Sequence, residues 1–78
     1  MELVKLTEAL ARALVDYPEQ VKVNEITGEQ ASLIELSVAK EDLGKIIGRE
    51  GRIAHALRLI LSCAAAKEHR HLTLAILE

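Results

Sequence analysis

The sequence predicts a two-layer α+β domain, in the order αββααβ, with three helices on one face of a three-stranded mixed sheet. Apolar residues recur at helical spacing in three segments and alternate at strand spacing in three others. The chain has 78 residues, the length of one domain, so residues 1–78 are expected to fold as a single unit. Half of the residues are hydrophobic, which is enough for a core and argues against disorder.

The first half is expected to form a helix and then a β-hairpin. The helix over residues 2–16 stops before Pro18, because the residue that precedes a proline avoids the α region. In the strand over 20–26, the apolar positions shift from odd to even numbers, which hints at a bulge or a slack edge. The strand over 31–38 alternates regularly. The residues expected to face the core are Leu3, Leu6, Leu10, Ala13 and Leu14 in the helix and Ile34, Leu36 and Val38 in the second strand.

The second half is expected to form two helices and a last strand. A short helix over 41–47 is broken by the glycine turn 48–51, a longer helix follows to about residue 66, and a strand covers 71–77. A crossover of two helices between the second and third strands favours a parallel pair. The long helix is expected to bury Ile53, Leu57, Ile60, Leu61 and Ala64.

Charge is distributed unevenly along the chain. The net charge of −2 and the pI of about 5.9 give no support for nucleic-acid binding. However, residues 1–42 hold four basic and nine acidic side chains, net −5, and residues 43–78 hold six basic and three acidic ones, net +3. Because local fields decide where a polyanion docks, the second half is the place to look for a site.

The glycine turn is the most informative segment. Gly48 and Gly51 leave both ends of the turn without a Cβ atom, so a nucleic-acid backbone can lie directly on the main chain. The start of the following helix offers N–H groups and partial positive charge to phosphates. Formal charge comes from Lys45, Arg49 and Arg52.

The segment Leu43-Gly44-Lys45-Ile46-Ile47-Gly48-Arg49-Glu50-Gly51-Arg52-Ile53 resembles the KH signature. The helix-first order of elements resembles the type II KH fold, and the length and the run from Ala39 to Gly48 are similar to the KhpA family of small bacterial KH proteins. The resemblance implies a non-enzymatic protein that holds about four nucleotides of single-stranded RNA on the turn and in an aliphatic groove. The RNA-binding residues that it implies are Lys45, Ile46, Ile47, Gly48, Arg49, Glu50, Gly51, Arg52 and Ile53.

The same resemblance implies a role as an RNA chaperone or post-transcriptional regulator, with self-association or pairing with a larger KH protein of the KhpB/Jag type. Glu50 departs from the family pattern, and two interpretations of it stay open: it weakens RNA binding, or it caps the following helix. Arg58 belongs either to a solvated helix face or to the interface. The alternative function is a dimerisation module with vestigial RNA binding, in contact through Leu33, Ala75 and Leu77.

Other classes of function find little support. Neither a nucleotide-binding glycine pattern nor a nucleophile with a base and an orienting partner is present, so neither catalysis nor a cofactor is expected. His55, His69, His71 and Cys63 fit no zinc spacing, and Cys63 is expected to serve packing, so no metal is expected. A lone cysteine fits a reducing cytoplasm, and the longest apolar run is too short to span a bilayer. The expectation is therefore a soluble cytoplasmic protein without a membrane partner.

Overall fold

The computed structural model describes residues 2–78 and has the predicted αββααβ order. Each bound lies within two residues of the predicted one. Short 3₁₀ turns precede β1, α2 and α3. The elements are α1 (Leu3–Leu14), β1 (Lys22–Thr27), β2 (Ala31–Ser37), α2 (Leu43–Ile47), α3 (Arg52–Ala66) and β3 (His71–Ile76).

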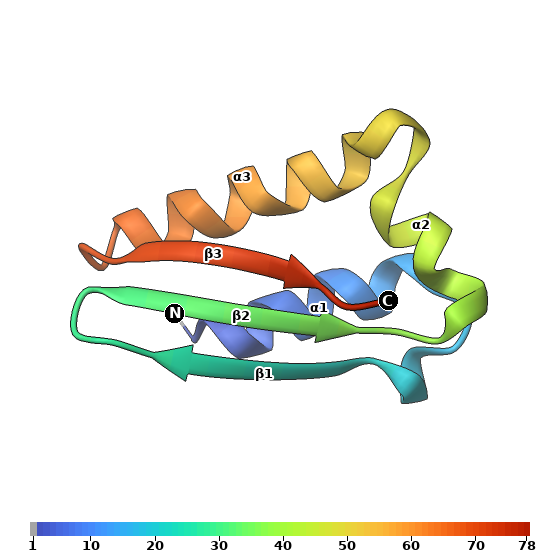
Figure 1. The fold of residues 1–78 in the computed structure, drawn as a ribbon, viewed down its shortest axis with the longest axis horizontal. Helices are drawn as coiled ribbons and strands as arrows, with labels where there is room; N and C mark the ends of the chain where they lie inside the picture. The colour runs from blue at the N-terminus through green and yellow to red at the C-terminus, as the bar shows by residue number, and fades with distance from the viewer. Residues whose placement is uncertain (1) are drawn as a thin grey trace.

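The three strands form one mixed sheet with β2 in the centre (Figure 1). The β1–β2 pair is antiparallel and the β2–β3 pair is parallel, as predicted. The β1–β2 register runs without interruption from Lys22 opposite Ser37 to Thr27 opposite Ser32, so the predicted bulge is wrong. The odd-to-even shift has another cause: Val21 is buried just before the strand, whereas Ile26 faces solvent.

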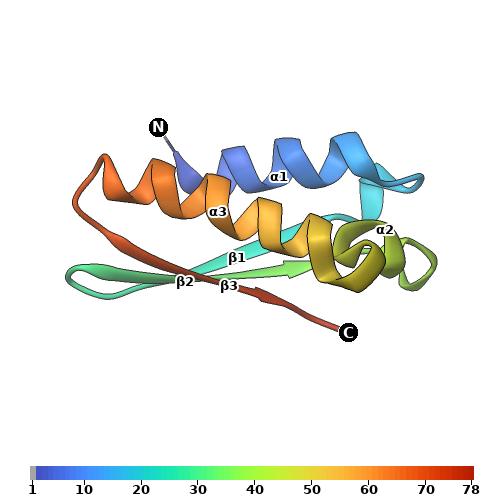
Figure 2. The same cartoon turned by 90° about the horizontal axis from the view of Figure 1, so that it is seen from above.

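The helices form the second layer. Figure 2 shows α1 and α3 side by side on one face of the sheet, with α2 at the end of this layer. Since α2 leads directly into α3, the turn between them lies at one end of the molecule, where no other element covers it in either view (Figures 1 and 2). Within residues 2–78, no helix is long and apolar enough to cross a bilayer.

The core lies between the two layers. Of the predicted inward residues of the second strand, Ile34 and Leu36 are buried and Val38, just after β2, is half-buried; Leu72 and Leu74 of β3 are buried as well. In α3 the buried face is turned slightly from the predicted one: Ala54 and Ala65 are buried and Ile60 is 46% exposed. Small side chains on this face let the helix lie close to the sheet. The buried cluster consists of Leu3, Ala11, Val21, Ile34, Leu36, Ile46, Leu57, Leu61, Ala65, Leu72 and Leu74.

Candidate nucleic-acid interface

Gly48 begins the turn in a backbone conformation that a residue with a side chain rarely adopts. Its φ is 76° and its ψ is 172°, and its amide donates to the Gly44 carbonyl at 2.8 Å, which ends α2. A Cβ atom at Gly48 would lie 2.6 Å from Cγ1 and 2.9 Å from the backbone nitrogen of Ile53. Gly48 is therefore required both for its positive φ and because Ile53 occupies the space beside it.

Glu50 and Gly51 continue the turn in left-handed conformations. Glu50 has φ 56° and ψ 25°, and Gly51 has φ 75° and ψ 14°. The Gly51 amide donates to the Gly48 carbonyl at 3.1 Å, but a Cβ at Gly51 would meet nothing within 4 Å. Among the backbone hydrogen bonds that close the turn, none is donated by the amides of Arg49 or Glu50. The tip of the turn therefore presents bare main chain and open space beside Gly51.

The charged side chains of the turn are largely exposed. The Nη2 atom of Arg52 lies 3.9 Å from Oε2 of Glu50, so Glu50 offsets part of the Arg52 charge. Within residues 2–78, Glu50 makes no side-chain hydrogen bond to the start of α3, so it is not a hydrogen-bonding cap; that its charge favours the helix start through the dipole stays a prediction. Within residues 2–78, no salt bridge or side-chain hydrogen bond involves Arg49, so its charge is fully available to a ligand.

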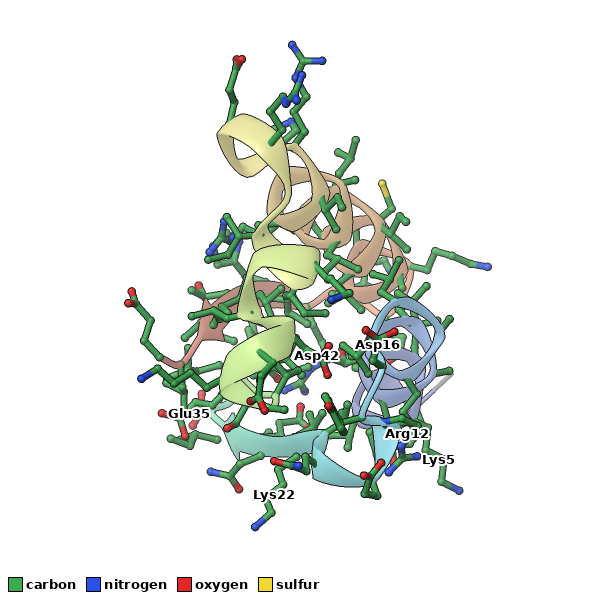
Figure 3. All side chains as sticks on the ribbon, turned by 90° about the vertical axis from the view of Figure 1, so that its right-hand side faces the viewer. Lys5, Arg12, Asp16, Lys22, Glu35 and Asp42 are labelled. Carbon is green, nitrogen blue, oxygen red and sulfur yellow. The ribbon has the colours of Figure 1, made fainter. Side chains whose placement is uncertain are left out.

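Lys45 is engaged on the side of the molecule where α1 ends. Its Nζ atom lies 3.3 Å from Oδ2 of Asp16 and 3.7 Å from Oδ1 of Asp42. Figure 3 shows these two carboxylates next to each other. The hydrogen bond and charge of Asp16, with a smaller contribution from Asp42, raise the pKa of Lys45 above its ordinary value. The ion pairs place the Lys45 ammonium on two carboxylates and leave it less available to a phosphate.

Asp42 is the residue that the sequence analysis missed. It is fully buried, and its two carboxylate oxygens accept from the backbone amides of Asp16 at 3.1 Å and Tyr17 at 3.0 Å. An acidic residue before a helix resembles an ordinary cap, but Asp42 makes no cap hydrogen bond to α2. It instead ties the start of α2 to the end of α1, and so positions the helix that carries the turn.

Of the predicted apolar contact residues, Ile46 lies in the core, whereas Ile47 and Ile53 keep exposed surface. Ile46 is completely buried in the core, so it supports the turn from beneath and offers nothing to a ligand. Ile47 and Ile53 are half-buried and keep exposed surface beside the turn. At the other end of α2 lies a pocket of about 520 Å³, lined by Ser37, Val38, Lys40, Leu43, Leu77 and Glu78.

Apolar surface is also exposed away from the turn. A groove of about 330 Å³ between α1 and α3 is lined by Leu10, Ala13, Leu14, Arg52, Ile53, Ala56, Leu57 and Ile60. On the uncovered sheet face, Ile26 and Leu77 are exposed, and Leu33 lies directly opposite Ile26 in the register. Cys63 is exposed, so its predicted packing role is wrong. In the described part of the chain, no three His, Cys, Asp or Glu side chains are grouped to hold a metal ion.

A family model described as KhpA/KhpB, KH domain, matches residues 4–76. The chain belongs to this KH-domain family. The resemblance that the sequence suggested is therefore confirmed, and the architecture is the type II KH arrangement of three helices on a three-stranded mixed sheet. The turn that carries the KH signature is the segment 48–51.

Curated relatives of the KhpA/KhpB family span almost the whole chain. The RNA-binding protein KhpA of Clostridium acetobutylicum is 48% identical over 73 residues, which are 94% of this chain and 97% of that protein. The RNA-binding protein KhpA of Borreliella burgdorferi is 47% identical over 75 residues, 96% of this chain and 92% of that protein. The one from Aquifex aeolicus is 46% identical over 76 residues, 97% and 96% of the two chains. No solved structure matches the chain.

Proposed function

We propose that this protein binds single-stranded RNA without catalysing a reaction, and that it holds the sugar–phosphate backbone against the turn 48–51. The observation that carries the proposal is the open, left-handed tip of this turn, where main chain is bare beside Gly51 and nothing would meet a Cβ within 4 Å. The printed names of the relatives, RNA-binding protein KhpA, support the same ligand.

Three features of the turn suit a phosphate. The amides of Arg49 and Glu50 donate no backbone hydrogen bond within residues 2–78 and are available as donors at its tip. Gly51 caps the start of α3, and helix N-termini favour anions. Arg49 adds a charge that no carboxylate among residues 2–78 offsets. The proposed contact residues are Ile47, Gly48, Arg49, Glu50, Gly51, Arg52 and Ile53, with Lys45 and Ile46 in supporting positions.

In the cell, the protein would use this binding to act as an RNA chaperone or post-transcriptional regulator in the cytoplasm. Pairing with a second copy, or with a KhpB/Jag-type KH protein, completes the proposal. The groove between α1 and α3 supports pairing, because its lining is apolar apart from Arg52 and Ile60 is 46% exposed there. Sedimentation equilibrium tests self-association, and Ile60→Arg is expected to shift a dimer toward monomer because it places a charge in an apolar contact.

The decisive experiment on RNA binding is Arg49→Asp, measured by fluorescence polarisation with labelled single-stranded RNA at about 50 to 200 mM salt. The variant is expected to abolish binding and to keep the wild-type circular dichroism spectrum, because Arg49 is exposed and makes no salt bridge within residues 2–78. Lys5→Asp makes the same change of charge on α1, at the far side of the molecule from the turn (Figure 3), and is expected to bind like wild type. Unchanged affinity of Arg49→Asp would refute the proposed function.

A further inference from the structure

Arg58 links the long helix to the free edge of the sheet. Its Nε atom donates to the main-chain carbonyl of Leu74 at 3.3 Å. β3 pairs only with β2, so it is an edge strand, and Leu74 lies in its middle. Arg58 therefore does not belong to a helix face whose side chains are simply solvated. Its guanidinium is anchored on the main chain.

The anchored guanidinium keeps most of its hydrogen-bonding capacity. A guanidinium has five N–H donors in a planar fork, and the contact with Leu74 uses the one on Nε. The two terminal amino groups remain, and they point in parallel from one edge of the plane. Arg58 is an exposed residue, and within residues 2–78 it forms no salt bridge. Arg58 thus presents a rigid pair of donors to a ligand.

Helix geometry places these donors on the same side as the open part of the turn. Gly51 is the N-cap residue of α3 and lies seven residues before Arg58, close to two full turns, so Arg58 lies on the side of the helix where Gly51 begins it. The rise of 1.5 Å per residue puts Arg58 about 10 Å along the axis from Gly51. A strand of RNA held by its backbone at Gly51 would therefore reach Arg58 with a neighbouring nucleotide.

We propose that Arg58 is a specificity-determining residue that binds the O6 and N7 acceptors of a guanine base, an inference that rests on the proposed RNA-binding function. Two parallel N–H donors match these two acceptors on one base edge, and this is the commonest specific contact of arginine with nucleic acid. A phosphate contact is less suitable here. The turn already supplies phosphate donors, and the Nε bond to Leu74 favours one position of the guanidinium over those that follow a flexible backbone.

The test uses short single-stranded RNAs in a fluorescence polarisation titration: an all-uridine strand, the same strand with one guanine, and that strand with 7-deazaguanine, which lacks the N7 acceptor. Wild type is expected to prefer the guanine strand about tenfold over the other two. Arg58→Lys keeps the charge but loses the planar fork. It is expected to lose this preference and to keep the wild-type affinity for all-uridine RNA.

Arg12→Lys is the matched control, because Arg12 is also an anchored arginine on a helix, with its Nη2 atom 2.9 Å from Glu8 on α1. It is expected to keep the guanine preference. If Arg58→Lys weakens binding to all three strands equally, Arg58 contacts phosphate and the inference is wrong. If only the melting temperature falls, Arg58 merely covers the edge of β3, and the inference is equally wrong. Neither result affects the proposed RNA-binding function. That proposal is refuted only if Arg49→Asp leaves the RNA affinity unchanged.

Discussion

The buried carboxylate of Asp42 attaches α2, the helix before the turn, to the segment that follows α1. The substitution Asp42→Ala tests how much this attachment stabilises the protein. The wild-type carboxylate is fully buried and accepts from the amides of Asp16 and Tyr17 at 3.1 and 3.0 Å. Lys45 lies 3.7 Å from the same carboxylate. The alanine variant removes all three interactions and leaves two amides without their acceptor in a partly buried position.

The expected cost follows from these bonds. A hydrogen bond to a charged group contributes about 1.5 to 3 kcal/mol, and two bonds on one carboxylate are not fully additive, so Asp42→Ala should lower the free energy of unfolding by about 3 kcal/mol. A domain of this length is stable by about 4 to 12 kcal/mol. The melting temperature should therefore fall by at least about 12 °C.

Thermal and urea unfolding, followed by circular dichroism, measure this cost. Asp16→Ala is the matched control, because its exposed side chain only pairs with Lys45 at the surface and its loss should cost less than about 1 kcal/mol. Asp42→Asn keeps the shape but replaces one acceptor oxygen by a donor, so it should fall between the two. If Asp42→Ala proved as mild as Asp16→Ala, the tie between α1 and α2 would contribute little, and the argument from buried hydrogen bonds would be wrong.

The other predictions concern the turn and its surroundings. Gly48→Ala should lower the free energy of unfolding by about 2 kcal/mol or more, because it adds a clash with Ile53 to the strain of positive φ, whereas Gly51→Ala should cost only about 1 kcal/mol for φ alone; thermal melts give the ranking. Glu50→Gln should raise RNA affinity in a polarisation titration, because it removes a charge that repels phosphate, and an unchanged or lower affinity would contradict this. Because the pKa of Lys45 is raised, the stability that its ion pairs contribute is fully present below the ordinary value of 10.5 and is lost as the pH rises through the raised value; Lys45→Met should lack this loss in urea titrations on the two sides of pH 10.5.

The arrangement of strands and helices could be predicted from periodicity, because each element buries one face. β2 shows this best: it lies between two strands under the helix layer, and its inward residues Ile34 and Leu36 are nearly inaccessible to solvent. Exceptions occur at the margins of the core. Ile60 has the hydrophobicity of a core residue but lies 46% exposed in the groove between α1 and α3, whereas the small Ala65 is fully buried. Periodicity identifies a face and not its limits.

For the candidate site, the sequence indicated the local geometry of the turn but not the contacts that distant residues make with it. The φ angles of Gly48 and Gly51 follow from a local sequence pattern, and the structure has both glycines in positive φ. The environment of Lys45 depends on Asp16, which is 29 positions away and whose proximity only the packing of α1 against α2 creates. Local patterns carry no information on such pairs, so a count of basic residues near the turn overestimates its available charge.

The small number of free cations indicates what the proposed RNA site of an acidic protein would depend on. Of the three cations that the sequence places near the turn, Lys45 is paired with two carboxylates and Arg52 lies 3.9 Å from Glu50. Arg49 alone keeps its full charge. For a single strand, each neutralised phosphate contributes a slope of about −0.7 to the dependence of log affinity on log salt. The proposed site would therefore depend on Arg49 for formal charge and on main-chain donors and apolar contacts for the rest of its affinity, and none of these requires a basic protein.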